Sequence, residues 1–197
     1  MIGGDIQMNE QRENIIRNAV SGTLRRQQST IYDTYSVLNG GAGLAMGETV
    51  TLFTIPQGGA KNELYTNLTR GGQIVNEMLD IKAIEIEMFS LGLVPMLQAE
   101  MNSFLYSLVF KLIVNNKEVL KQPASRYPAG SGAYGAEGLA VGNGLPSAKN
   151  IQVVASEKIT KVDSFTVELY CGNAIANPAV DVQLRVYLDG DIYDVVN

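Results

Sequence analysis

The pattern of apolar and polar positions changes its period near residue 48. Before that point, residues 9–26 carry apolar side chains at helical spacing and Asn9 is a suitable N-cap, so this segment predicts an amphipathic helix. The apolar face comprises Ile15, Ile16, Ala19, Val20 and Leu24. A polar connector follows, and the glycines near its end, at 40, 41 and 43, are typical of a hinge. We therefore expect residues 1–47 to form a helix and a glycine-rich hinge, with a separate folded body in residues 48–197.

After residue 48 the apolar positions alternate with a period of two, which predicts strands. The predicted strands are 49–55, 63–69, 84–88, 104–114, 118–121, 151–155, 165–171 and 182–188, with 192–196 returning from a hairpin turn at Asp189-Gly190. Asn115-Asn116 also predicts a tight turn. No helical crossovers separate these segments, so their order favours an antiparallel sandwich or barrel of roughly eight or nine strands over a parallel sheet.

Six glycines and three prolines fall within residues 123–150, a stretch that carries little charge. Loops of this length are uncommon in compact domains and usually have a function. Because this loop is apolar and contains Tyr127 and Tyr134, we expect it to lie against a neighbouring subunit. Tyr32 and Tyr35 are further interface candidates, since tyrosine combines an apolar ring with a polar tip. Ordinary packing at the rim of the body is the alternative for these tyrosines.

The composition removes several classes of site. The 197 residues include no histidine, no tryptophan and a single cysteine. Without histidine the chain cannot form a histidine-based catalytic triad or an imidazole metal site, and one cysteine excludes an intrachain disulfide. Only 18% of the residues are charged, which suits a protein whose surface is largely covered by neighbours. We therefore predict a non-enzymatic protein with no cofactor, no metal site and no small-molecule substrate.

Two patterns that resemble enzyme motifs have structural explanations that we favour. Residues 130–135 match the string G-x-G-x-x-G, but no strand precedes them and no helix follows, so they predict a loop. Glu85 and Glu87 could form an acid pair, yet they alternate with apolar residues on one predicted strand. The polar outer row of a half-buried strand therefore explains this pair better than catalysis does.

The acidic residues near the C-terminus resemble a fragment of a calcium loop. Asp189, Asp191 and Asp194 supply only three carboxylates, whereas a calcium ion takes six or more oxygen ligands. A turn at Asp189-Gly190 explains the first part of the pattern without a metal. Cys171 lies in an alternating strand, where we expect it to be a small buried apolar residue.

The charge is distributed unevenly along the chain. Arg12, Arg17, Arg25 and Arg26 are four of the seven arginines, whereas residues 163–197 hold six acids and one arginine. We favour packing of the apolar stripe of the predicted helix on its own or a neighbouring body; the alternative is that the helix turns these arginines towards a membrane surface or nucleic acid. The sequence shows no secretory signal, and its longest uncharged apolar stretch, 101–110, is about half the length of a membrane-spanning helix.

A leading helix at 9–26, a glycine hinge and strands near 49–56, 84–90, 104–114, 165–171 and 182–196 make an architecture that resembles a known family. It is similar to the single jelly-roll major capsid proteins of icosahedral viruses, especially the small upright-barrel subunits of tailless, membrane-containing bacterial and archaeal viruses. The resemblance spans the whole chain and implies an antiparallel jelly roll of about eight strands with an N-terminal helix. In that family the helix lies beneath the barrel, near the internal membrane, and the barrels stand upright to tile the shell.

The resemblance implies a function in assembly. The chain would be a virion protein, made in the host cytoplasm, that associates with copies of itself in an icosahedral shell. A second capsid protein, an internal lipid membrane and the genome are further implied partners. One alternative is another phage structural protein of the tail or baseplate. A second is a non-enzymatic jelly-roll module that binds a ligand such as carbohydrate, although the lack of tryptophan counts against it.

Overall fold

The computed structural model describes residues 3–20, 24–90, 96–127 and 152–195. The elements, in chain order, are α1 (Gly3–Val20), β1 (Leu24–Val37), β2 (Thr49–Leu52), β3 (Met78–Ser90), α2 (Gln98–Ser107), β4 (Leu108–Val114), β5 (Lys117–Pro123), the 3-10 turn η1 (Ala124–Arg126), β6 (Gln152–Thr160), β7 (Phe165–Cys171) and β8 (Val182–Val195). The described part of the chain is therefore mainly β.

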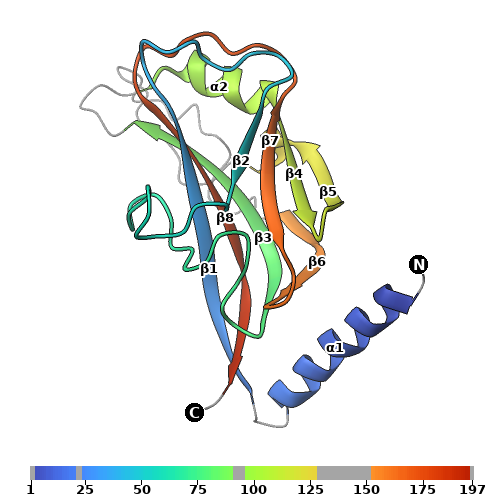
Figure 1. Ribbon diagram of the computed structural model, residues 1–197. Helices are drawn as coiled ribbons and strands as arrows, with labels where there is room; N and C mark the ends of the chain where they lie inside the picture. The colour runs from blue at the N-terminus through green and yellow to red at the C-terminus, as the bar shows by residue number, and fades with distance from the viewer. Residues whose placement is uncertain (1–2, 21–23, 91–95, 128–151, 196–197) are drawn as a thin grey trace.

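The eight described strands form two four-stranded antiparallel sheets that pack face to face (Figure 1). One sheet has the order β1-β8-β3-β6 and the other the order β2-β7-β4-β5. The chain thus crosses between the sheets at almost every connection, and only the β4–β5 hairpin stays within one sheet. Eight strands wrapped in this order form a jelly roll, which confirms the predicted fold class.

The core lies between the sheets because the strands alternate apolar and polar side chains. In β4 the inward-facing Phe110 and Leu112 are completely buried, and so are Val167 and Leu169 in β7. Burying each such side chain contributes about 2 kcal/mol relative to leaving it exposed. The alternation that identified these strands in the sequence therefore also provides most of their stability.

Several predicted elements are confirmed. Residues 84–88 lie in β3, where Ile84, Ile86 and Met88 are buried and the two intervening glutamates are half-buried, and β7 has the predicted bounds. Asn115 and Asn116 form the predicted tight turn between β4 and β5. Their φ angles of 51° and 61° are the left-handed values that such a two-residue hairpin turn requires.

The N-terminal prediction is wrong in its boundaries. The helix α1 begins at Gly3 and ends at Val20, six residues before the predicted end at Arg26, and residues 24–37 form strand β1 where a connector was expected. β1 pairs with β8 along its whole length, from Leu24 to Val37. Its polar side chains weaken the local strand signal, but several find partners across the pair; Ser36, for instance, donates to Gln183 over 2.6 Å. Long-range pairing therefore decides the conformation, and β1 belongs to the folded body.

Residues 63–69 do not form the predicted strand, and they cap the edge of β1 instead. The side-chain amide of Asn67 accepts a hydrogen bond from the backbone N–H of Tyr32 (2.8 Å) and donates one to the carbonyl of Thr30 (2.7 Å). One side chain thus occupies edge positions that another strand could otherwise use. The loop blocks strand addition at this part of the sheet edge.

The predicted strand 104–114 is correct only from Leu108 onwards. Residues 98–107 form the helix α2, because Met101, Phe104, Leu105 and Leu108 recur at intervals of three and four and are all buried. Glu100 supports the start of the helix by accepting a hydrogen bond from the backbone N–H of Leu97 (3.1 Å). The apolar residues of 104–114 appeared to lie on both faces of one long strand. They belong instead to the buried face of the helix α2 and to the buried strand β4 that follows it.

The predicted hairpin at Asp189-Gly190 is also wrong, because β8 continues through both residues to Val195. Gly190 faces a bulge in β3, where the register shifts between Ile81 and Ala83. A Cβ atom at Gly190 would lie only 2.0 Å from the carbonyl oxygen of Asp80. Glycine is therefore needed at this position because β3 and β8 approach each other closely. It does not mark a turn, as the sequence had predicted.

We predict that Gly190→Ala lowers the free energy of unfolding by about 3 kcal/mol, because the two central strands must separate to admit the methyl group. Gly59→Ala is the matched control, since a Cβ there meets nothing nearer than 3.6 Å. Urea unfolding followed by far-UV circular dichroism measures both. Equal effects of the two substitutions would contradict the close-approach explanation.

Candidate functional site

The four arginines predicted to face a membrane or nucleic acid do not share one helix face. Arg12 and Arg17 lie in α1, whereas Arg25 and Arg26 lie in β1. Arg26 forms an ion pair with Asp191 of β8 (2.8 Å), which raises the pKa of the guanidinium. Arg12 points towards Asp163, while Arg17 and Arg25 are exposed. The arginines therefore form no single basic surface among the described residues.

The helix α1 packs on the base of the sandwich through a small apolar cluster. Ile15 contacts Met78 of β3 and Tyr193 of β8, and all three are buried. Ile16 and Leu24 pack at the margin of this cluster, which is separate from the main core. Packing of the helix on its own body, one form of the favoured prediction, is thus what the structure shows for this stretch of α1.

Asp163, in the β6–β7 turn, is the acidic partner at the docking site of α1. Its buried carboxylate accepts hydrogen bonds from the backbone N–H and hydroxyl of Thr160 (both 2.7 Å) and from the amide of Asn115 (2.6 Å). Arg12 Nη2 lies 3.7 Å away. Burial alone would raise the pKa of this carboxyl group, but the hydrogen bonds from Thr160 and Asn115 and the charge of Arg12 outweigh it and lower the pKa.

The predicted interface tyrosines have different surroundings. Tyr127 is 1% exposed and packs its ring against Phe110 with centroids 5.2 Å apart, so the prediction of an interface role for this residue is wrong. Its backbone carbonyl also accepts a hydrogen bond from the N–H of Ile86. Tyr134 lies outside the described residues, as do residues 130–135. Tyr32 and Tyr35 are half-buried on β1, and Tyr35 packs against the main core.

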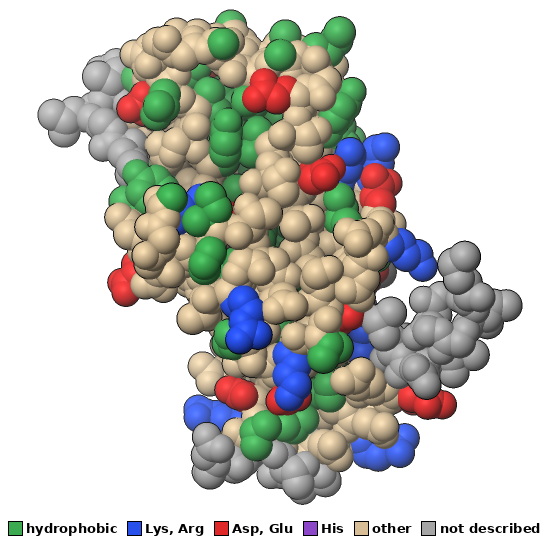
Figure 2. All heavy atoms as spheres, viewed as in Figure 1, with side chains coloured by type: hydrophobic (Ala, Val, Ile, Leu, Met, Phe, Trp, Pro, Cys, Tyr) green, Lys and Arg blue, Asp and Glu red, His purple; other side chains and the backbone are tan. Residues whose placement is uncertain are grey.

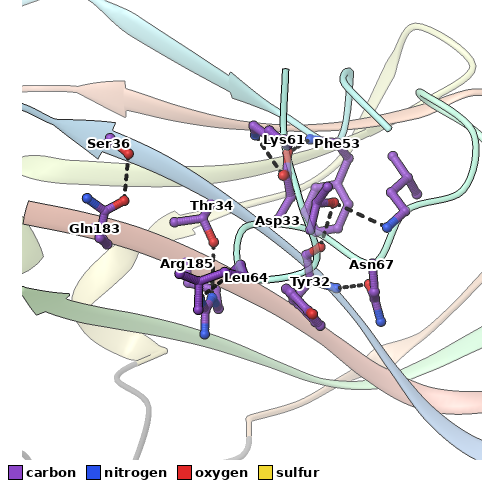
Figure 3. A network of polar contacts seen from close by, with 12 residues as sticks. Tyr32, Asp33, Thr34, Ser36, Phe53, Lys61, Leu64, Asn67, Gln183 and Arg185 are labelled. Atoms are coloured by element: carbon purple, nitrogen blue, oxygen red, sulfur yellow. Dashed lines mark hydrogen bonds and ion pairs between the residues drawn. The ribbon is translucent and has the colours of Figure 1, made fainter. Parts of the chain in front are cut away.

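Tyr32 belongs to a polar cluster around Arg185 on the outer face of the β1-β8-β3-β6 sheet (Figure 3). The guanidinium of Arg185 donates to Thr34 Oγ1 (3.0 Å) and to the carbonyl of Leu64. It also lies over the rings of Tyr32, Phe89 and Tyr187 at 4.6–5.9 Å from their centroids. Arg185 thus connects β1, β3, β8 and the 57–68 loop. Its charge therefore stabilises the fold through these hydrogen bonds and ring contacts.

Glu87 completes this cluster and clarifies the predicted acid pair. Its carboxylate lies 3.7 Å from Arg185 and accepts a hydrogen bond from the hydroxyl of Tyr187. Burial and this hydrogen bond raise the pKa of Tyr187 to about 12, so the phenol stays protonated. Burial and the charges of Asp189 and Glu87 raise the pKa of Glu85. Both glutamates thus lie in the polar outer row that the sequence predicted.

A second buried charge lies on the inner face of β1. The side chain of Asp33 is completely buried and forms an ion pair with Lys61 (2.7 Å), and it also accepts a hydrogen bond from the N–H of Phe53 (2.6 Å; Figure 3). Phe53 follows β2 with a φ of 64°, a left-handed value that is strained for a bulky residue. Asp33 therefore holds both the end of β2 and the following loop against β1.

The three aspartates that resembled a fragment of a calcium loop each interact with a different partner. Asp189 accepts a hydrogen bond from Thr30, Asp191 pairs with Arg26, and Asp194 accepts one from Asn76 (3.2 Å). Within the described ranges, no group of three or more potential metal ligands occurs. Cys171 is 1% exposed, which confirms the prediction of a buried residue, and burial raises the pKa of its thiol.

The sequence analysis missed an apolar surface at the end of the sandwich opposite α1. Segments 38–48, 96–107 and 172–181 meet there, through bonds such as Leu44 N–H to Ile175 O (3.0 Å) and Ala179 N–H to Glu100 (2.7 Å). We call this surface the apolar end. It exposes four large side chains, Leu38 (58%), Met46 (70%), Leu97 (53%) and Tyr106 (74%). Exposed alanines surround them at 42, 45, 99, 174, 176 and 179.

The apolar end is also lean in charge. Its three segments contain no lysine or arginine and only three carboxylates, those of Glu48, Glu100 and Asp181. Each carboxylate accepts a hydrogen bond from a backbone N–H group that also belongs to the apolar end. Figure 2 shows apolar side chains scattered among backbone and uncharged polar groups at the top of the molecule, with acidic side chains between them, whereas the lysine and arginine side chains lie lower down. The absence of charge from 38–47 and 172–180 is the sequence signal that could have identified this surface.

Comparison of the chain with protein-family models, curated proteins and solved structures gave no match. In the described part of the chain, no helix has the length and apolar character needed to cross a membrane.

The Asp33–Lys61 pair predicts a strong energetic coupling. Asp33→Asn should lower the free energy of unfolding by about 3 kcal/mol, because it leaves the Lys61 ammonium, whose side chain is only 17% exposed, without its counter-charge. The double variant Asp33→Asn, Lys61→Met should be destabilised by less than the sum of the two single variants. A double-mutant cycle in urea measures this, and strictly additive effects would show that the pair is not coupled.

The lowered pKa of Asp163 predicts a pH-dependent contribution to stability. The folded state holds the ionised form more tightly than the unfolded state, so the stabilisation exists above the ordinary aspartate pKa and disappears as the pH falls through the folded value. Asp163→Asn should cost about 2 kcal/mol at pH 7. The difference should shrink below about pH 3.9. Unfolding in urea at pH 7 and pH 3 tests this, with the exposed Asp194→Asn as control.

Proposed function

We propose that this chain is a structural subunit that assembles with copies of itself into a closed shell, as the single jelly-roll capsid proteins do. The observation that carries the proposal is the apolar end, a surface of the jelly roll that exposes four large apolar side chains and carries few charges. Monomeric proteins rarely expose several large apolar side chains together, and such patches mark sites of association. The proposal assigns no reaction to the chain.

A second copy of the chain is the partner that the apolar end fits best. Its three carboxylates each accept a hydrogen bond from the backbone, which offsets part of the cost of desolvating them. Interfaces of this kind have an apolar core and few charges at their centre. Many modest contacts suffice in a shell, because multivalency strengthens the whole assembly.

The strand edges contribute less to the proposed contacts than the ends do. Asn67 caps the edge of β1, and the edge strand β5 carries Lys117, Glu118 and Lys121 and ends at Pro123. Charged residues and proline at a sheet edge oppose the addition of further strands. The contacts expected from the sequence were apolar strand edges, tyrosines and the loop at 123–150, and we now give more weight to the apolar end.

In this proposal the base of the sandwich, with α1, faces the interior of the virion. Arg17 of α1 and Arg25 of β1 are exposed there and supply positive charge towards an internal membrane or the genome. A second capsid protein is a further partner of the shell.

Sedimentation velocity at increasing concentrations of the purified chain tests the proposal, with electron microscopy to show the geometry of any particles. We expect large assemblies that persist in 1 M sodium chloride and are favoured by sulfate, because apolar contacts are not screened by salt. Met46→Lys and Tyr106→Lys should each weaken association at least about tenfold, since each buries an unpaired charge. Val75→Lys, at a position 54% exposed but outside the apolar end, should assemble normally.

The outcomes separate the alternatives. Tubes or open rings would favour a tail or baseplate component. A monomer under all conditions would overturn the proposal and favour a ligand-binding module. Loss of assembly in Val75→Lys as well as in the two other variants would show that the apolar end is not the specific contact.

A further inference from the structure

We propose that a small hollow on the flank of the sandwich binds one uncharged sugar ring. The hollow has a volume of about 150 Å³ and lies between β1, the loop residues 67–69 and 73–76, and Ile192 of β8. We call it the flank hollow. It shares no residue with the apolar end, so this inference goes beyond the proposed function and does not depend on assembly.

The volume of the flank hollow limits the size of the ligand. Pockets that enclose drug-sized ligands have volumes of about 300–1,000 Å³, so a hollow of about 150 Å³ accommodates a smaller group. A single six-membered sugar ring has this size, whereas a whole nucleotide or a lipid chain is larger. The flank hollow therefore fits one sugar ring and not a longer oligosaccharide.

The lining of the flank hollow matches the chemistry of a sugar. Six of its eleven residues carry a hydroxyl or carboxamide group, and the other five are aliphatic. Hydroxyl and carboxamide groups both donate and accept hydrogen bonds, as the hydroxyl groups of a sugar do. The aliphatic side chains provide an apolar surface for the C–H groups of the ring. The polar six are Ser29, Thr30, Asn67, Thr69, Gln73 and Asn76.

Charged ligands fit the flank hollow poorly, because no charged residue lines it. Two carboxylates bond to its lining: Asp189 accepts a hydrogen bond from Thr30. Asp194 accepts one from Asn76 over 3.2 Å. Their negative charge opposes an anion, and Arg70 is exposed and does not line the hollow. A cation would lose its water without any charged group in the lining to replace it.

Part of the lining is fixed before any ligand binds. The side chain of Asn67 accepts a hydrogen bond from the N–H of Tyr32 (2.8 Å; Figure 3) and donates one to the carbonyl of Thr30 (2.7 Å). The aliphatic residues Ile31, Leu68 and Ile74 are at most 8% exposed and pack in the main core. Walls that are already ordered lower the entropic cost of binding.

Three polar side chains, one from each wall, are available to the ligand. Ser29 of β1, Thr69 and Gln73 line the hollow, and their side chains make no hydrogen bond within the described residues. Because they come from three segments, they can bond to different hydroxyl groups of one ring and fix its orientation. The lining contains no aromatic ring on which a sugar could stack, so we expect a weak Kd of about 1 mM.

Saturation-transfer-difference NMR with the full-length protein tests the inference, since it works with monomers and with large assemblies. The probes are glucose, galactose, mannose and N-acetylglucosamine, each titrated to about 50 mM. We expect saturation transfer to the C–H protons of at least one of them. The monophosphate of the sugar that binds is the charged probe, and it should bind more weakly than the sugar itself.

Two variants locate the site. Thr69→Val and Gln73→Leu keep the size of the side chain and remove its hydrogen-bonding group, so each should raise the Kd of the bound sugar at least about fivefold. Thr51→Val is the matched control, because Thr51 is exposed on β2 and does not line the hollow, and it should leave the Kd unchanged. Far-UV circular dichroism checks that each variant folds, and a folding defect in one leaves the other as the test.

Three outcomes would overturn the inference. Absence of saturation transfer to all four sugars shows that the hollow is not a sugar site. Binding that is unchanged in both Thr69→Val and Gln73→Leu places the sugar elsewhere on the protein. Tighter binding of the monophosphate than of the sugar shows that the ligand is an anion.

Discussion

The fold depends on the pairing of the second element of the chain with the last. β1 and β8 run antiparallel over fourteen consecutive residue pairs, and β8 pairs with β3 on its other side. This pairing joins the N-terminal segment to the body, although the paired residues are 145 to 171 positions apart in sequence. It also fixes both ends of the molecule. The pair begins at the base, beside α1 and Tyr193, and finishes where Val37 and Val182 lead into the loops of the apolar end.

Two buried carboxylates attach loops to this framework. Asp33 lies inside the sandwich and holds Lys61 and the strained Phe53, while Asp163 closes the β6–β7 turn and receives Arg12. A buried carboxylate is stable only when charge and hydrogen bonds replace the lost water, and both residues meet this condition. Each therefore holds a segment that lies outside the eight described strands: the 53–68 loop in one case and the helix α1 in the other.

The sequence predicts the elements whose signal is local and misses those that depend on distant partners. The strands at 84–88 and 165–171 and the Asn115-Asn116 turn are correct because alternation and turn chemistry are visible within a few residues. β1 is missed because its polar side chains have partners on β8 and its edge backbone bonds to Asn67, and no local window of the sequence contains these partners. Asp189-Gly190 has the composition of a turn, but its glycine is required by the backbone of β3 on the neighbouring strand.

The candidate surfaces also show that local sequence signals fail where distant partners decide the structure. Arg12 and Arg26 are prominent in the sequence as unpaired basic residues, yet each faces an aspartate that lies more than 150 residues further along the chain. Conversely, the apolar end is built from three segments that are individually unremarkable in the sequence, and only the jelly-roll order brings them together. The result is a molecule with two unlike ends, one apolar and nearly uncharged and one charged with a docked helix. In the shell that we propose, this difference between the two ends would orient each subunit relative to its neighbours.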